Sequence, residues 1–250
     1  MAANALKQRL LANEPCYGAW LNVPNSFVAE IVGHQGFDYV CIDLQHGMID
    51  YPAATEMLLA IHAAGSTPVV RVPSNDLGAI NRVLDAGAMG IIVPLVEGLE
   101  DARRAVRACR YPPDGARSFG PNRAAYAAGP DYFATANDEV LCIPMIETRG
   151  ALDAIDAIVA EPGVDAVYVG PNDLSLALGQ PPGADNPDPY QSAYQRIAKA
   201  CEGGAVAAGI HASVSLAAKH VATGYRMITV STDTSTLAKG SARDLETARG

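Results

Sequence analysis

Two acidic residues, Glu147 and Asp173, stand directly behind apolar segments of the length of a buried β-strand. Glu147 ends VLCIPMIE (140–147), and Asp173 follows DAVYVG (165–170). A pair of carboxylates, with further positions left to water or substrate, suits a hard divalent cation such as Mg²⁺ or Mn²⁺. The alternative for Glu147 is an acid that stabilises the N-terminal end of the helix expected after it. The pattern favours a metal site.

An aspartate and a histidine follow another apolar segment, FDYVCID (37–43). Burying a carboxylate or an imidazole costs free energy unless the group is paired or used. Asp43 precedes His46 by three residues, which is close enough to orient the imidazole and to stabilise its charged form, as a general acid or base requires. The alternative is a core histidine bonded to a backbone carbonyl, and the spacing leaves both interpretations open.

An arginine, Arg71, stands near the end of a third apolar segment, TPVVRV (67–72). A guanidinium in such a place must find an anion, which is either a neighbouring carboxylate or the carboxylate of a substrate. A metal ion beside Arg71 would favour the second alternative, the carboxylate of a substrate. The other polar residues expected at the ends of strands are Trp20, Asn22, Asn172 and His211.

The elements that would position these residues recur along the whole chain. Most of the segments are continuous apolar runs, as in a parallel sheet covered on both faces, and helix-like patterns that often end in glycine separate them. Eight such units in 250 residues predict an α/β fold, a single (β/α)8 TIM barrel over residues 1–250, in which the C-terminal ends of all strands meet. A doubly wound open sheet is the alternative, but no G-x-G-x-x-G follows an early strand. The expected strands are 17–23, 37–43, 67–72, 90–96, 140–147, 165–170, 205–210 and 226–231.

Two stretches interrupt this pattern. Residues 111–139 are rich in Pro, Gly and Tyr and carry Arg117 and Arg123. Loops of this length in compact domains are usually functional or disordered, so we expect this one to follow the fourth strand and to lie over the C-terminal face, where barrel active sites are built. A second irregular stretch, 178–190, follows the sixth strand.

Composition excludes several classes of function. The net charge is −9, with no cluster of lysine or arginine, which argues against a nucleic-acid partner. No run of about 18 apolar residues occurs, and the start of the chain lacks the apolar core of a signal peptide, so we expect a cytoplasmic protein without membrane contact. The five cysteines are scattered and include no C-x-x-C pair, which indicates neither a disulfide framework nor a zinc cluster.

The sequence resembles the metal-dependent pyruvate aldolases of the 4-hydroxy-2-oxo-acid (hydroxyketoacid) aldolase family, which are related to the citrate lyase β-subunit. The motifs that carry the resemblance cover nearly the whole chain: GFDYVCIDLQHG, VVRVPSND, VLDAGAMGIIVPLV, YPPDGARSFGP, IETRGAL and GPNDLSLALG. The resemblance implies a (β/α)8 barrel in a homo-oligomer, a hexamer or a trimer, with the last helix exchanged between subunits. It also implies a divalent metal ion, Mg²⁺, Mn²⁺ or Co²⁺.

The resemblance also assigns roles to particular residues. Glu147 and Asp173 would bind the metal, Arg71 would stabilise an enolate, and His46 with Asp43 would act as the acid–base dyad. Further residues are assigned by position: Gly170, Pro171 and Asn172 to the donor carboxylate, Trp20 and His211 to substrate binding, and Gln45 and Asp85 to a subunit contact or to support of the site.

The chain departs from the family pattern at three positions. Met145 stands where many members have glutamine, and Gln45 stands where many have an acidic residue. LQH together with MIE resembles the branch that accepts hydroxypyruvate as well as pyruvate. His211 replaces an apolar residue of the aldehyde pocket, so the acceptor is expected to differ.

These observations together predict a class II aldolase that cleaves a 4-hydroxy-2-oxo acid into an aldehyde and pyruvate or hydroxypyruvate. A Schiff-base aldolase would need a lysine at the end of a strand, and all four lysines fall in helix-like segments. Two alternatives remain. An acyl-CoA lyase of the citrate lyase β-subunit type would need a basic groove, for which Arg117, Arg123 and Arg149 are the candidates. A non-catalytic barrel that binds a small carboxylate is the other.

Overall fold

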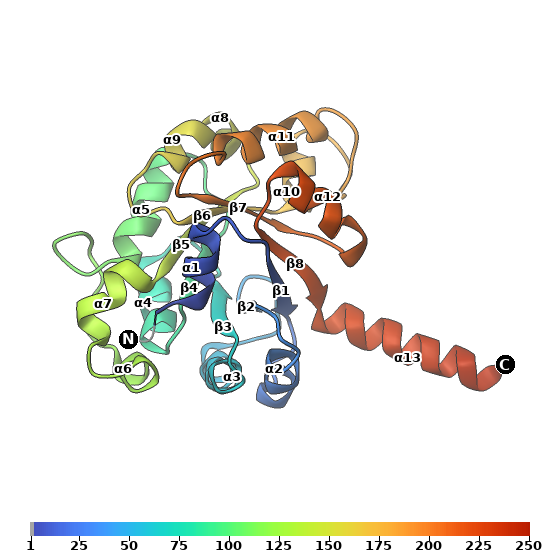
Figure 1. The fold of residues 1–250 in the computed structure, drawn as a ribbon, viewed down its shortest axis with the longest axis horizontal. Helices are drawn as coiled ribbons and strands as arrows, with labels where there is room; N and C mark the ends of the chain where they lie inside the picture. The colour runs from blue at the N-terminus through green and yellow to red at the C-terminus, as the bar shows by residue number, and fades with distance from the viewer. Residues whose placement is uncertain (1–2) are drawn as a thin grey trace.

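The computed structural model describes residues 3–250 and forms a closed barrel of parallel strands that pair in chain order (Figure 1). The expected fold, a (β/α)8 TIM barrel, is confirmed. Strand boundaries differ from those expected by a few residues, most at β4, which ends three residues early. The strands are β1 (Cys16–Leu21), β2 (Tyr39–Asp43), β3 (Thr67–Arg71), β4 (Gly90–Val93), β5 (Leu141–Ile146), β6 (Ala166–Val169), β7 (Ala207–His211) and β8 (Met227–Thr232).

Helices surround the barrel, and several of them begin at a side-chain cap. The side chains of Asn25, Asp50, Asp76 and Thr148 each accept the backbone N–H three residues further on, which satisfies a donor that the first turn leaves free. The helices are α1 (Ala5–Leu11), α2 (Ser26–Gly33), α3 (Tyr51–Ala63), α4 (Leu77–Asp85), α5 (Leu99–Cys109), α6 (Asn122–Ala128), α7 (Tyr132–Glu139), α8 (Arg149–Asp153), α9 (Ile155–Val159), α10 (Pro171–Ala177), α11 (Tyr190–Ala200), the 3₁₀ turn η1 (Val214–Leu216), α12 (Ala217–Thr223) and α13 (Asp233–Arg249).

Alternate residues of each strand point into the barrel, because side chains in a strand alternate between its two faces. Apolar residues such as Cys41, Val69 and Ile143 form a separate buried core there, distinct from the larger one between strands and helices. At the C-terminal ends, the same inward positions hold Asp43 and Arg71, which lie opposite each other in the β2–β3 register. The alternation thus points the polar side chains at the C-terminal ends of the strands into one opening of the barrel, its mouth.

The opposite end of the barrel is closed by α1. Leu6 and Leu10 are buried in the interior core together with Cys16 at the start of β1. The ammonium of Lys7 lies 2.7 Å from the carboxylate of Asp165, just before β6. This end of the barrel is therefore plugged, and access to the interior lies at the C-terminal ends of the strands.

The position expected for residues 111–139 is wrong. The segment follows α5, not β4, and leads into the start of β5, so it lies at the N-terminal ends of the strands. It contains α6 and α7 and has its own small core. Arg117 is buried and lies 2.9 Å from Asp85, and Arg123 donates to the carbonyl of Ala86. In a strand–helix–strand unit, residues inserted after the helix lie at the N-terminal ends of the strands, away from the site. The expectation treated this segment as the loop between β4 and its helix, whereas it is the loop between α5 and β5.

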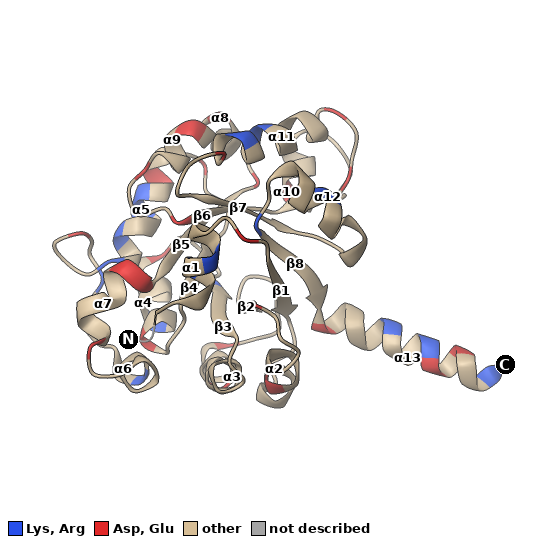
Figure 2. Ribbon diagram, in the orientation of Figure 1, with Lys and Arg blue, Asp and Glu red and all other residues tan. Residues whose placement is uncertain are grey.

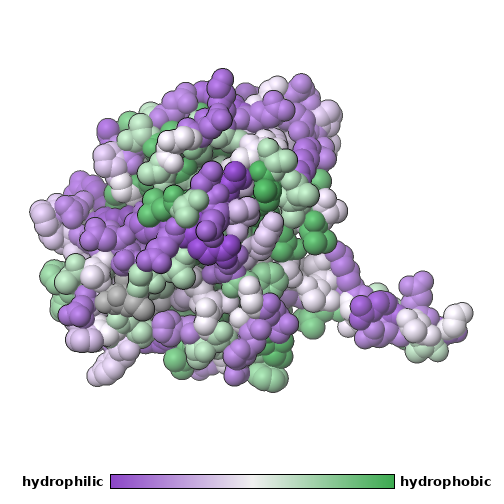
Figure 3. Space-filling model, viewed as in Figure 1, coloured by the Kyte–Doolittle hydropathy of each residue, from purple (hydrophilic) through white to green (hydrophobic). Residues whose placement is uncertain are grey.

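The last helix, α13, leaves the barrel and extends away from it (Figures 1 and 3). Its buried first residue, Asp233, accepts the backbone N–H groups of Asn22 and Val23. Further along, Leu237 and Leu245 are about half exposed. Acidic and basic residues are interspersed over α13 and the outer helices (Figure 2). Within residues 3–250, no helix combines the length and the hydrophobicity needed to cross a membrane.

Candidate active site

A cavity of about 320 Å³ opens at the C-terminal ends of the strands. Most of the polar residues predicted for the site line it, although they come from strands far apart in sequence. The structure brings together Trp20, His46, Arg71, Gly170, Pro171, Asn172, Asp173 and His211 in this one cavity, with Met145, Tyr168 and Ala184 beside them.

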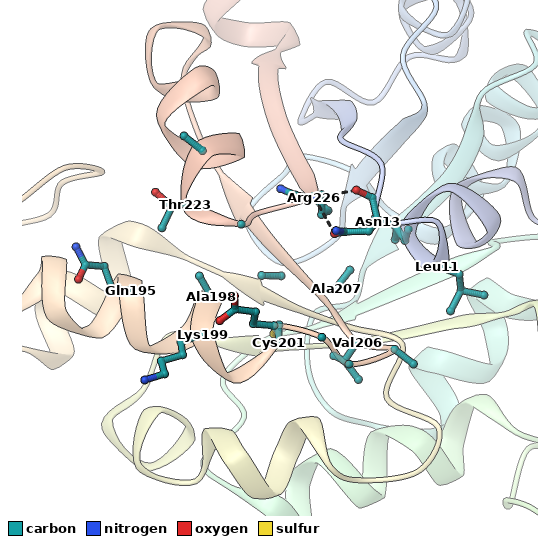
Figure 4. Close-up of a pocket in the computed structure, with 18 residues that line it drawn as sticks. Leu11, Asn13, Gln195, Ala198, Lys199, Cys201, Val206, Ala207, Thr223 and Arg226 are labelled. Atoms are coloured by element: carbon teal, nitrogen blue, oxygen red, sulfur yellow. Dashed lines mark hydrogen bonds between the residues drawn. The ribbon is translucent and has the colours of Figure 1, made fainter.

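A larger cavity, of about 660 Å³, lies at the other end of the barrel between the ends of α1, α11 and α12 (Figure 4). Alanine and glycine make up nearly half of its lining, and the polar side chains are spread around its edge. Arg226 donates to Asn13 there, and Lys199 and Gln195 lie apart from that pair at the edge of the cavity. No set of chemically complementary side chains converges in it, so the smaller cavity is the candidate site.

The Asp43–Arg71 ion pair occupies the mouth of the barrel. Arg71 donates from Nε to Asp43 Oδ1 at 2.9 Å and from Nη2 to Oδ2 at 2.5 Å, a bidentate geometry. Oδ2 also accepts from the indole of Trp20 at 3.1 Å. Burial alone would raise the pKa of Asp43, but the hydrogen bonds and charge of Arg71 hold it below its ordinary value. The pair therefore stays ionised.

The expected contact between Asp43 and the His46 imidazole is not present. Asp43 Oδ1 accepts the backbone N–H groups of Gln45 and His46, at 3.0 and 3.2 Å. No hydrogen bond within the described chain joins the carboxylate to the imidazole, which is exposed on the loop after β2. The physical reason is that Arg71 lies opposite Asp43 on the neighbouring strand and offers a full charge in bidentate geometry. Asp43 thus positions Arg71 and the loop that carries His46, and not the imidazole itself.

Glu147 carries an unpaired oxygen. Its Oε1 accepts the backbone N–H of Leu95 at 2.8 Å, whereas its Oε2 is buried and has no hydrogen-bond partner. Burial raises the pKa of Glu147 to about 7, and the nearby charge of Asp173 adds to the rise. Gly170 makes room for the carboxylate, since a Cβ there would lie 2.3 Å from Oε2. A buried acceptor without a partner, beside a second carboxylate, is the arrangement expected at a cation site.

Asp173 is the second carboxylate and belongs to the neighbouring strand–helix unit. It lies in the first turn of α10, directly after β6, and β6 pairs with β5, which ends just before Glu147. Its side chain is exposed to the cavity. No cluster of three or more His, Cys, Asp or Glu residues able to hold a metal occurs among residues 3–250. A cation bound by these two carboxylates would take its other ligands from water or substrate.

Aromatic rings form the floor and one wall of the cavity. The Trp20 ring stacks on Tyr168 at a centroid distance of 5.7 Å, and the Arg71 guanidinium lies 5.0 Å from the Trp20 centroid. His211 meets Trp20 edge-on at 5.1 Å. Burial, and then the charge of Arg71, lower the pKa of His211 to about 4, so this imidazole is neutral near pH 7.

The remaining predicted residues lie away from the cavity. Gln45 has a buried side-chain oxygen without a partner, and Asp85, at the end of α4, pairs with Arg117. Sequence reasoning missed Tyr168 and Leu95. The alternation that placed Gly170 also points Tyr168 inward, so it could have been found. Leu95 could not, because its left-handed backbone (φ 53°) is uncommon for a leucine and has no sequence signal.

The chain is similar in sequence to a family of known enzymes. Residues 17–240 match the family model described as HpcH/HpaI aldolase/citrate lyase. The chain is 38% identical to hydroxypyruvate/pyruvate aldolase of Paraburkholderia phytofirmans, over 98% of each chain. It is 38% identical to 5-keto-4-deoxy-D-glucarate aldolase of Salmonella newport, over 79% of this chain and 78% of that one.

Solved structures resemble the barrel as well. An HpcH/HpaI aldolase/citrate lyase family protein from Burkholderia cenocepacia superimposes with a TM-score of 0.92 at 39% identity, over 99% of this chain and 100% of that one. The citrate lyase β subunit of M. tuberculosis, solved with oxaloacetate and magnesium, gives 0.58 at 15% identity, over 89% of this chain and 93% of that one. The second likeness shows a shared fold only.

Proposed function

The chain belongs to the HpcH/HpaI aldolase/citrate lyase family and is a carbon–carbon lyase, and from this we propose that it is a metal-dependent aldolase that cleaves 4-hydroxy-2-oxo acids. The products would be an aldehyde and pyruvate or hydroxypyruvate, the donors named for the relative from Paraburkholderia phytofirmans. The observation that carries the proposal is the unpaired, buried Oε2 of Glu147, which lies in the same barrel mouth as the charge of Arg71. That combination suits a donor that becomes negative during the reaction.

The proposed chemistry divides among the residues that line the cavity and the two buried carboxylates behind them, Asp43 and Glu147. A divalent cation held by Glu147 and Asp173 would supply Lewis-acid stabilisation of negative charge on the donor. Arg71, fixed by Asp43, meets the charge that develops on the donor oxygen when the carbon–carbon bond breaks. His46 takes the proton from the hydroxyl at C4 during cleavage and returns it during synthesis.

Substrate contacts are assigned to the walls of the cavity. Gly170, Pro171 and Asn172 line it beside Asp173, and we assign the donor carboxylate to them. Trp20 presents an apolar ring to the donor carbons. His211 faces the same cavity as a neutral imidazole, and we assign it to the polar groups of the acceptor.

An acyl-CoA lyase is less well supported. Of the arginines that could bind the phosphates of coenzyme A, Arg117 is buried against Asp85, and Arg123 is bonded to the carbonyl of Ala86 in the segment that precedes β5. Only Arg149, which begins α8 after β5, remains at the correct end of the barrel. Relative rates with acyl-CoA esters and with free oxo acids would distinguish the two activities.

Metal removal tests the first part of the proposal. EDTA should abolish aldol cleavage, and Mg²⁺, Mn²⁺ or Co²⁺ should restore it. Glu147→Gln and Asp173→Asn should each be inactive and lose the rise in melting temperature that added metal causes, because each removes a charged ligand. Borohydride with pyruvate should trap no lysine adduct in mass spectrometry. Turnover by a demonstrably metal-free sample, or a trapped lysine, would refute the mechanism.

Replacement of His46 by Ala or Asn tests the proton transfer. The rate of cleavage should fall by about 10²- to 10⁴-fold, the usual loss for a general base, while binding of metal and pyruvate stays close to wild type. His62→Ala, an exposed histidine on α3, is the matched control and should keep full activity. A His46 variant within a few-fold of wild type in steady-state kinetics would remove His46 from the mechanism.

Replacement of His211 by Leu tests the choice of acceptor. The loss of a neutral hydrogen-bonding ring should shift the ratio of kcat/KM for alkyl over hydroxylated aldehydes upward by about 10-fold. His211→Asn keeps a polar side chain and should change the ratio less. An unchanged ranking of aldehydes in His211→Leu would show that this side chain does not meet the acceptor.

A homo-oligomer, a trimer or hexamer, is the proposed assembly, with α13 packed on another copy. The support is the exposure of Leu237 and Leu245 on α13 and of Phe27 and Ile31 on α2. Deletion of residues 237–250 should lower the mass measured by light scattering, while circular dichroism retains the signal of the barrel. A monomeric full-length chain at micromolar concentration would contradict this assembly.

A further inference from the structure

Three hydroxyl groups meet inside the barrel. Thr229 Oγ1 on β8 lies 2.9 Å from the hydroxyl of Tyr39 on β2 and 2.6 Å from that of Tyr168 on β6. All three side chains are fully buried. Most of the core around them is apolar, so hydroxyl groups are not needed to fill it. Buried polar groups that satisfy one another fix the orientations of the side chains that carry them.

The barrel makes room for the two tyrosine rings with two glycines. A Cβ on Gly18 of β1 would lie 2.1 Å from the Tyr39 ring, and one on Gly209 of β7 would lie 2.7 Å from the Tyr168 ring. Burial raises the pKa of both phenols far above the ordinary value, so both hydroxyls keep their protons. The two rings and the three hydroxyl groups therefore form one packed, hydrogen-bonded unit across the interior of the barrel.

This unit is connected to the site through Tyr168. Its ring lines the cavity and stacks on Trp20 with an interplanar angle of 26°. Trp20 in turn donates to Asp43 and lies beneath the Arg71 guanidinium. A tilt of the Tyr168 ring would therefore move the indole that contacts both members of the ion pair.

We propose that Thr229 is a positioning residue for the aldol reaction: its hydroxyl fixes Tyr168, which holds Trp20 and thereby the Asp43–Arg71 pair. This inference rests on the role proposed above for Arg71. Small misplacements of a charged group that acts on the transition state can reduce the rate strongly, so the effect should appear in kcat.

A matched pair of variants separates positioning from packing. Thr229→Val keeps the branched shape and loses the hydroxyl, whereas Thr229→Ser keeps the hydroxyl and loses a methyl group. In the metal-loaded enzyme, Thr229→Val should reduce kcat by about 10-fold with KM for the aldehyde within about 2-fold, and Thr229→Ser should retain most of kcat. A role in packing alone predicts the reverse order, and that result would overturn the proposal.

The second measurement does not depend on activity. Trp20 is the only tryptophan of the chain, so intrinsic fluorescence reports this ring alone. Time-resolved anisotropy should show a more mobile indole in Thr229→Val and wild-type behaviour in Thr229→Ser. If wild type lacks aldolase activity but the anisotropy follows this order, the proposed function fails, and the positioning of Trp20 by the Thr229 hydroxyl stands. If wild type is active and neither kcat nor anisotropy responds to loss of the hydroxyl, the positioning fails.

Tyr168→Phe provides the test if Thr229→Val does not fold. It keeps the stacked ring and removes only the hydroxyl, and it should reproduce the loss of kcat and the increased mobility of Trp20. Tyr39→Phe leaves the Tyr168–Thr229 contact intact and should have the smaller effect on both. Equal effects of the two phenylalanine variants would contradict a path through Tyr168.

Discussion

The ion pair between Asp43 and Arg71 is the interaction on which the site depends. Each group alone would be costly to bury in the mouth of the barrel, but together they satisfy each other in bidentate geometry. Asp43 also receives the indole of Trp20 and two backbone N–H groups of the following loop. The Asp43 carboxylate thus holds the Arg71 guanidinium, the Trp20 indole and the loop that carries His46 in place. This rigidity is what a preorganised site for negative charge requires.

Glu147, in the same mouth of the barrel, is a buried carboxylate that lacks a full set of partners. Its Oε2 is buried without a partner, and its raised pKa reflects the cost of keeping that charge out of water. Gly170 makes the position sterically available, and the left-handed Leu95 directs an amide to the other oxygen. The protein therefore maintains a carboxylate that its own residues leave half satisfied. Strain and unsatisfied groups of this kind concentrate at functional sites.

The two ends of the barrel serve different purposes. At the N-terminal ends of the strands, α1 closes the interior, and the segment with α6 and α7 packs beside it. The larger cavity lies at this end, yet its polar side chains do not converge on one point, and its arginine is bonded to Asn13. At the C-terminal ends, a smaller cavity gathers charged, aromatic and imidazole groups. Cavity size alone is therefore a poor guide to the site here, and the chemistry of its walls is the better one.

The sequence by itself determined the strands, the barrel and the inward positions of Glu147, Arg71 and His211, because strand alternation and apolar runs are local properties of the chain. It did not determine which partner Asp43 would choose, because Arg71 reaches it only through the β2–β3 register. The contacts of Thr229 with Tyr39 and Tyr168 likewise join β2, β6 and β8 across the barrel. The position of residues 111–139, by contrast, follows from their place after α5 in the chain. Pairings such as those of Asp43 and Thr229 exist only once the barrel has closed, since closure brings distant residues within hydrogen-bond reach.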